Sequence, residues 1–220
     1  QARPLATAAI KAALAQSGVA PSEVEYTCMG WVMQDPRSPN IAKTAAEHAG
    51  VPVTSPGTTF HENCASGSAA VHSLCRRILL GEVTLAVAGG VESMSNVARY
   101  LYEGRNKGQA YGDLALVDGV MGALFDAFAG EKGELMGLLS ERLAERYAVS
   151  RADQDAVTER SHRAALDAWS RGLFADYVVP VEVPQRKGAA VKVERDEGPK
   201  AVTLEELAKA RPYFKKDGTI

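Results

Sequence analysis

The chain has 220 residues, of which 46% are hydrophobic and 24% charged, and it carries a formal net charge of −2. This composition is typical of a soluble globular chain and argues against nucleic acid as a partner. No apolar run approaches the ~18 residues that a membrane span needs, and no signal peptide opens the chain, so we expect no membrane partner. A cytoplasmic location is the expectation, with an organelle matrix as the alternative.

The first half of the chain predicts helices and strands in alternation, which favours parallel α/β layers. The first helix carries Leu5, Ala9, Ala12 and Ala13 at helical spacing and ends before Gly18. The predicted helices cover residues 3–17, 40–49 and 66–80, and the predicted strands cover or end at residues 24–29, 58–60 and 84–88.

One cysteine lies on the turn between the strand that ends at residue 60 and the helix that begins at residue 66. Cys64 therefore stands at a helix N-terminus, where unpaired N–H groups favour a thiolate and can bind an oxyanion. The small residues 65–68 leave room for a thioester. A free cysteine also often only fills core space, so local spacing alone leaves a catalytic and a structural role equally open.

The other thiols carry less information. Cys28, Cys64 and Cys75 are too few and too scattered for a disulfide framework or a zinc site, so we expect no metal and a reducing compartment. Cys75 is predicted on the same helix as Cys64, ~16 Å further along and beyond disulfide reach. We expect a structural role for Cys75.

After Ser95 the alternation stops and a second, mainly helical module is predicted. A helix over residues 132–147 carries a leucine stripe, and Ser150 with Asp153 forms a capping-box start for the next helix. The remaining predicted elements are a helix over 151–171, a hairpin from strands 177–183 and 191–193, and a short helix from Thr203 to Arg211.

Motifs in both halves resemble the thiolase family. The acylated-cysteine signature is matched from Cys64 through Gly67 and Val71 to Ile78, and residues 89–95 read Gly-Gly-Val-Glu-Ser-Met-Ser. Phe60 and His61 depart from the residues usual there, which we interpret as altered packing under the turn. The second half resembles the family's loop domain at residues 124–128, 136–137, 140–141, 150–155, 172–174, 211–214 and 217–219.

The resemblance implies the fold. We expect an incomplete, thiolase-like layered α/β/α domain over residues 1–95, which carries the nucleophile. A mainly helical loop domain over residues 96–220 is expected to cover the active site and bind coenzyme A. The family's C-terminal domain is absent from this sequence.

The resemblance also implies the chemistry: thiolysis of a 3-ketoacyl-CoA, or the reverse Claisen condensation, through an acyl-Cys64 intermediate. The Cys64 N–H is expected to form half of the oxyanion hole, and coenzyme A acts as substrate, with no permanent cofactor. Acetoacetyl-type members usually carry histidine where Leu135 stands, which favours a broader or degradative thiolase. The residues expected to contact coenzyme A are Leu124, Leu135, Met136 and Phe214 on the pantetheine arm and Lys200 at a phosphate.

The family's Gly-His-Pro, Asn-Glu-Ala-Phe and Cys-x-Gly-Gly-Gly motifs do not occur in this sequence. The histidines at 48, 61, 72 and 162 are expected to be structural or solvated, so we expect no turnover by this chain alone. A homodimer or homotetramer is expected to pair across residues 58–62. The alternatives are a condensing enzyme of the ketoacyl-synthase type and a non-catalytic acyl-CoA-binding protein.

Overall fold

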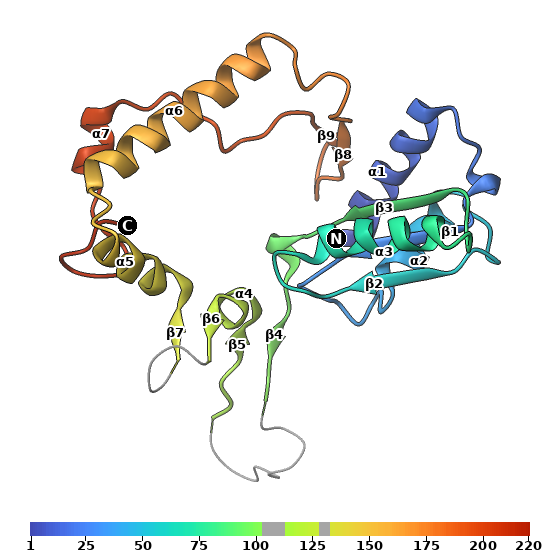
Figure 1. Ribbon diagram of the computed structural model, residues 1–220, viewed down its shortest axis with the longest axis horizontal. Coiled ribbons are helices and arrows are strands. Elements are labelled where there is room, and N and C mark those ends of the chain that lie inside the picture. The colour runs from blue at the N-terminus through green and yellow to red at the C-terminus, as the bar shows by residue number, and fades with distance from the viewer. Residues whose placement is uncertain (103–112, 128–132) are drawn as a thin grey trace. The chain divides into compact units, whose positions relative to one another are not determined.

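The computed structural model describes residues 1–102, 113–127 and 133–220 (Figure 1). Contacts divide the chain into two compact units, Gln1–Val120 and Met121–Ile220. Phe128 and Lys132, which belong to predicted features, lie outside the described residues. The domain boundary expected at residue 95/96 stays a prediction.

The first unit contains a parallel sheet of three strands in the order β2-β1-β3. The strands are β1 (Tyr26–Gly30), β2 (Gly57–Phe60) and β3 (Ala86–Gly90). Gly30 is in register with Phe60 on one side and with Gly90 on the other, so all three strands end at one edge. The carboxyl edge of a parallel sheet is where α/β proteins place their ligand sites. The layered α/β class predicted from the sequence is confirmed.

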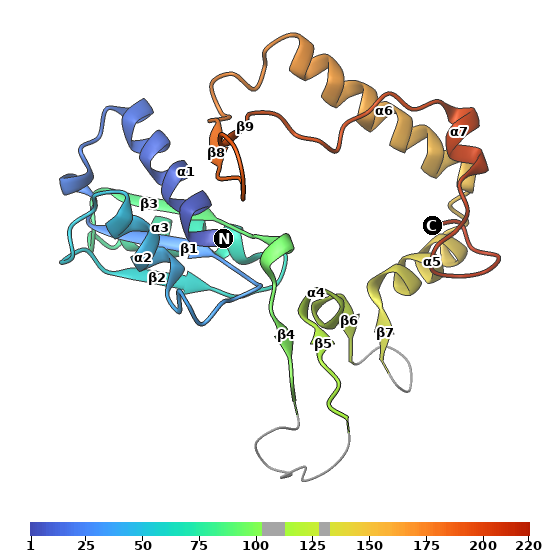
Figure 2. The ribbon, with the colours of Figure 1, turned by 180° about the vertical axis from the view of Figure 1, so that it is seen from behind.

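Helices pack on both faces of this sheet (Figure 2). Met29 and Trp31 join the core formed with α1 (Ala2–Ser17) and α2 (Ile41–His48). Cys28 points the other way, toward Ala70 and Leu74 of α3 (Ser66–Leu79). This alternation follows from the period of two along a strand. It fixes α3, and the turn that precedes it, on the face opposite to α1 and α2.

The sequence predicted the wrong buried face for α1. Leu5 and Ala9 are exposed, and the buried stripe consists of Ala2, Ala6, Ile10 and Leu14. The helix is rich in alanine on every side, so the hydrophobic period does not single out one face. On α3, helical spacing predicts an apolar face of Ala70, Val71, Leu74 and Ile78; Ala70 and Leu74 are buried, whereas Val71 and Ile78 are exposed.

Short strands follow the first sheet and have no counterpart in the prediction. β4 (Arg99–Tyr100) pairs antiparallel with β5 (Val117–Asp118), and α4 (Gly119–Ala123) comes directly after it. A strand of two residues has no period to detect. The mainly helical module expected after Ser95 thus contains short strands beyond the one predicted hairpin.

The second unit begins with a small strand pair, β6 (Phe125–Asp126) and β7 (Glu134–Leu135). Residues 134–135 form a strand, so α5 starts at Met136, later than predicted, and ends at Arg146. The Ser150 hydroxyl accepts the Asp153 N–H at 3.1 Å and caps the next helix. The remaining elements are α6 (Arg151–Ser170), the pair β8 (Val181–Val183) and β9 (Val191–Val193), and α7 (Leu204–Lys209), whose predicted capping box is confirmed.

A buried carboxylate ties the end of the chain to α5. Glu141 is 3% exposed and accepts the N–H groups of Thr219, at 2.9 Å, and Ile220, at 2.8 Å. These backbone hydrogen bonds hold the pKa of Glu141 below its ordinary value, assisted by the Thr219 hydroxyl and the charge of Lys215, while desolvation acts in the opposite direction. The ionised form is therefore the one that the folded unit stabilises.

We expect this tether to make stability depend on pH. Because the pKa of Glu141 is lower in the folded than in the unfolded chain, its contribution is complete above the unfolded pKa and is lost as the pH falls through the folded pKa. Urea unfolding of wild type and Glu141→Gln between about pH 7 and about pH 3 measures this. The difference in unfolding free energy between wild type and Glu141→Gln should shrink in acid. A difference that stays constant with pH would contradict the proposed role of the Glu141 carboxylate.

Candidate active site

The N-terminus of α3 lies directly on the carboxyl edge of the sheet. A Cβ on Gly30 would stand 2.5 Å from the backbone nitrogen of Gly67 and 2.5 Å from the carbonyl carbon of Ser66. A Cβ on Gly90 would stand 3.8 Å from the Gly67 Cα. Glycine is required at residue 30 because only a residue without a side chain permits this approach. The ends of β1 and β3 thus fix the position of the turn before α3.

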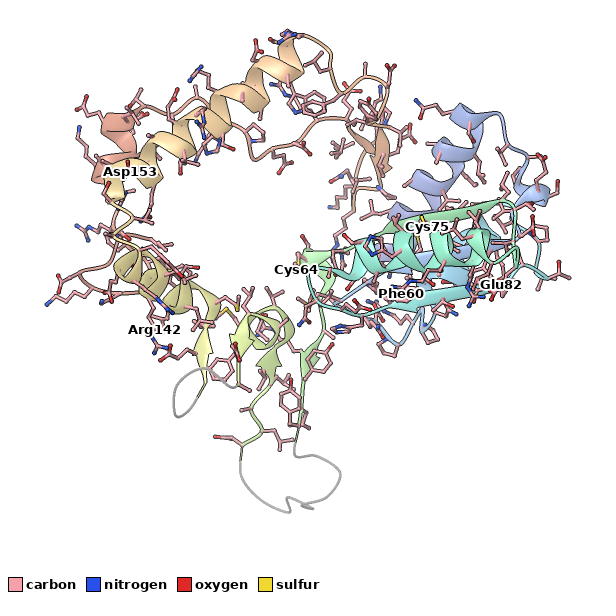
Figure 3. All side chains as sticks on the ribbon, in the orientation of Figure 1. Phe60, Cys64, Cys75, Glu82, Arg142 and Asp153 are labelled. Carbon is pink, nitrogen blue, oxygen red and sulfur yellow. The ribbon has the colours of Figure 1, made fainter. Side chains whose placement is uncertain are left out.

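Ser66 holds that turn together from inside. Its hydroxyl accepts the Glu62 N–H at 2.9 Å and donates to the Asn63 carbonyl at 2.7 Å. Asn63 has a φ of 48°, in the left-handed region that asparagine tolerates better than most residues. Cys64 follows it and is exposed, at the start of α3 (Figure 3). The predicted placement of Cys64 between β2 and α3 is confirmed.

The two departures from the family signature have different surroundings. Phe60 is half-buried and packs against the cluster of Cys28, Ala70 and Leu74, and its carbonyl accepts the Trp31 N–H at 3.0 Å. His61 is exposed. Altered packing under the turn therefore describes Phe60 but not His61.

Glu92 is a residue whose positioning role the sequence did not indicate. Its carboxylate accepts the N–H of Val32 and, at 3.2 Å, the N–H of Met33. It thereby joins the loop after β3 to the loop after β1, beside the end of the sheet. The signal in the sequence was a glutamate two residues after the end of β3.

The three thiols differ in accessibility. Cys28 is 0% exposed, and burial raises the pKa of its thiol. Cys64 and Cys75 are exposed. Cys75 lies on an open side of α3 and is not buried as Cys28 is, and its structural role stays a prediction.

Alkylation should follow this order. We expect substoichiometric iodoacetamide to label Cys64 and Cys75 and to leave Cys28 unlabelled, because a buried thiol is both inaccessible and protonated. Peptide mapping of the folded chain measures the labelled fraction at each position, with chain unfolded in urea as the control in which all three react. Early labelling of Cys28 in the folded chain would contradict the packing described here.

Three of the four residues expected at the pantetheine arm lie together in the second unit, and the fourth, Phe214, lies against the residue after Met136. The Leu124 carbonyl accepts the Met136 N–H at 2.9 Å. Leu135 of β7 pairs with Phe125 of β6, the residue after Leu124. The Phe214 ring lies against Gly137, where a Cβ would overlap it. Leu124 is 45% and Met136 50% exposed, so this apolar group, which we call the Met136 surface, is open to a ligand.

Lys200 lies elsewhere in the same unit. Its N–H donates to the His162 ring at 3.4 Å, against α6. Lys200, Ala201 and Val202 line one side of a cleft of about 420 Å³ whose other side is α6. These contacts link Leu124, Leu135 and Met136, with Phe214 against the adjoining Gly137, whereas Lys200 lies apart from them, against α6 in the segment before α7.

Residues 1–220 match a family model described as the N-terminal domain of thiolase. This chain belongs to the thiolase family. It is 39% identical to an acetyl-CoA acetyltransferase of Chromobacterium violaceum over 98% of the chain and 55% of that protein. It is 37% identical to a probable acetyl-CoA acyltransferase of Staphylococcus aureus over 93% of the chain and 52% of that protein.

The thiolase fold is supported independently by a solved structure. The crystal structure of the Bacillus anthracis acetyl-CoA acetyltransferase matches with a TM-score of 0.92 and 36% identity, covering 100% of this chain and 55% of that one. The chain thus spans about half the length of the thiolases it matches. These matches favour a thiolase over the ketoacyl-synthase alternative.

Neither a metal site nor a membrane helix is found in the described part of the chain. Within residues 1–102, 113–127 and 133–220, no three His, Cys, Asp or Glu side chains gather so as to hold a metal ion. In the same ranges no helix is long and apolar enough to cross a membrane.

Proposed function

We propose that the protein containing this chain is an acyltransferase that cleaves 3-ketoacyl-CoA with coenzyme A, or runs the reverse condensation. The observation that carries the proposal is the position of Cys64, exposed on a clamped turn at the N-terminus of α3, above the carboxyl edge of a parallel sheet. The names of the matching thiolases support the same chemistry. The chain belongs to that family over its whole length.

The reaction has two steps. The Cys64 thiolate attacks the 3-keto carbon, the bond between carbons 2 and 3 breaks, and the departing acetyl-CoA carbanion takes a proton. The sulfur atom of a second coenzyme A then attacks the acyl-Cys64 carbonyl and releases the thiolate. In the oxyanion hole we assign one donor, the Cys64 N–H, because the N–H groups of Ala65 and Ser66 already bond to the carbonyls of Glu62 and Asn63.

We assign substrate binding to the second unit. The Met136 surface consists of Leu124 and Met136, which are exposed, and Leu135 and Phe214, which are half-buried; its apolar, accessible side chains suit a pantetheine arm. We propose that Lys200 contacts a phosphate group of coenzyme A. Leu135 in place of histidine favours a broader or degradative 3-ketoacyl-CoA thiolase.

We also propose a homodimer or homotetramer in the cytoplasm. Among the described residues β2 pairs only with the strand β1, so its other side is a sheet edge that a second copy could extend, beyond the Gly57 carbonyl that already accepts from the Asn40 side chain. Light scattering of the full-length protein tests this. A monomer at micromolar concentration would contradict it.

A thiolysis assay tests the proposed function. The full-length protein should turn over 3-ketoacyl-CoA, whereas residues 1–220 alone should not, since a missing general acid/base removes about 10²–10⁴-fold and missing oxyanion donors remove more. The exposed thiol of Cys64 can still be acylated slowly in residues 1–220. Turnover by residues 1–220 within tenfold of the full-length protein would show that the acid/base lies within this chain.

A further inference from the structure

Glu141 is a buried titratable residue that the proposed reaction does not use. It lies one turn after Gly137 on α5, and residues four apart in a helix share a face. That shared face receives residues 213–220: the Phe214 ring at Gly137, and the Thr219 and Ile220 amides at Glu141. A Cβ on Gly218 would overlap the Glu141 carboxylate, so the backbone itself lies against it.

The segment is closed at its other end as well. The Tyr213 N–H donates to the Ile220 carbonyl at 2.8 Å, which makes residues 213–220 a loop with adjoining ends. Gln154 of α6 donates to the Thr219 hydroxyl at 2.9 Å, and that hydroxyl donates to Glu141 at 3.2 Å. Fixing residues 219 and 220 therefore fixes the start of the loop, where Phe214 lies.

From these contacts we infer that Glu141 is a positioning residue for coenzyme A binding: it holds the loop 213–220 so that Phe214 completes the Met136 surface. This inference rests on the proposed function, which places the pantetheine arm on that surface. Glu141 does not touch the substrate. It acts through Phe214, because its carboxylate accepts hydrogen bonds from the amides that close the loop 213–220.

Glu145 provides a matched control. It lies on α5 four residues further along and forms an ion pair with Lys215 of the same loop, but it is exposed. Exposed ion pairs contribute little. Glu145→Gln and Glu141→Gln make the same chemical change on the same helix, toward the same loop, and only the second removes a buried acceptor.

The test is the dissociation constant of coenzyme A, measured by calorimetry on the full-length protein. We expect Glu141→Gln and Phe214→Ala each to raise it about tenfold, since small misplacements of a binding group have effects of this size or larger. The double variant should bind no more weakly than Phe214→Ala alone, because the two changes remove the same contact. Glu145→Gln should bind as wild type does.

Additive effects in the double variant, or wild-type binding by Glu141→Gln, would overturn the inference. Turnover by the wild-type protein is measured separately, so failure of the thiolysis reaction is distinguished from failure of the positioning role. Should Glu141→Gln not fold, Thr219→Ala carries the test, because it removes the hydroxyl between Glu141 and Gln154 without leaving a buried charge. It should weaken binding about threefold, and unchanged binding would overturn the inference.

Discussion

Replacing Cys64 with serine should reduce thiolysis by the full-length protein about 10⁴-fold or more. A serine hydroxyl at neutral pH is a far weaker nucleophile than a thiolate, and Cys64 is the exposed thiol on the clamped turn before α3. Single-turnover acylation measures the first step directly, without contributions from product release. Coenzyme A binding should be retained, because the Met136 surface lies in the other unit.

Cys75→Ser is the control for this experiment. Cys75 is also exposed, on the same helix, but it is not on the turn. Its replacement should leave both acylation and turnover within about twofold of wild type, as for a surface substitution away from a site. Activity of Cys64→Ser within tenfold of wild type would remove Cys64 from the proposed mechanism.

The second large effect concerns Gly30. Gly30→Ala should destabilise the protein by about 1–3 kcal/mol, the cost of overpacking, because the added carbon meets the backbone of Ser66 and Gly67 at 2.5 Å. These backbone atoms cannot move out of the way by a change of rotamer, as the end of a flexible side chain can. The N-terminus of α3 must move, so the acylation rate of Cys64 should fall as well.

Gly67→Ala is the matched comparison, since Gly67 lies on the other side of the same contact. A Cβ there has no heavy atom within 4 Å, and the residue is in a helix, where alanine is favoured over glycine by about 1 kcal/mol. The free energy of unfolding of Gly67→Ala, measured in urea, should equal or exceed that of wild type. Equal effects of the two substitutions would contradict the close packing of α3 on the sheet.

The elements that the sequence predicted correctly are those long enough to show a period. The three strands of the first sheet, the helices α2, α3 and α6, and the position of Cys64 follow from spacing and from the stop signals at glycine. The family motifs then indicated the thiolase family, to which the chain belongs. These features depend on local sequence, which is why they could be predicted.

What the sequence could not show depends on contacts between distant residues. Glu141 falls inside a stretch read as a leucine stripe, yet it is Glu141 that is buried, because amides nearly eighty positions away bond to it. The exposure of Cys75 likewise depends on what packs against α3, which a helical period does not reveal. The short strands β4 to β7 are set by pairing between segments, not by their own composition.

The most direct test of the account is the site of acyl transfer. The full-length protein is incubated with acetyl-CoA, quenched in acid and mapped by peptide mass spectrometry. We predict one acetyl group per chain, as a thioester on Cys64, which free coenzyme A removes and which Cys64→Ser does not form. Acetylation of Cys75 in place of Cys64, or no acetyl-enzyme in a protein that binds coenzyme A, would contradict the central claim.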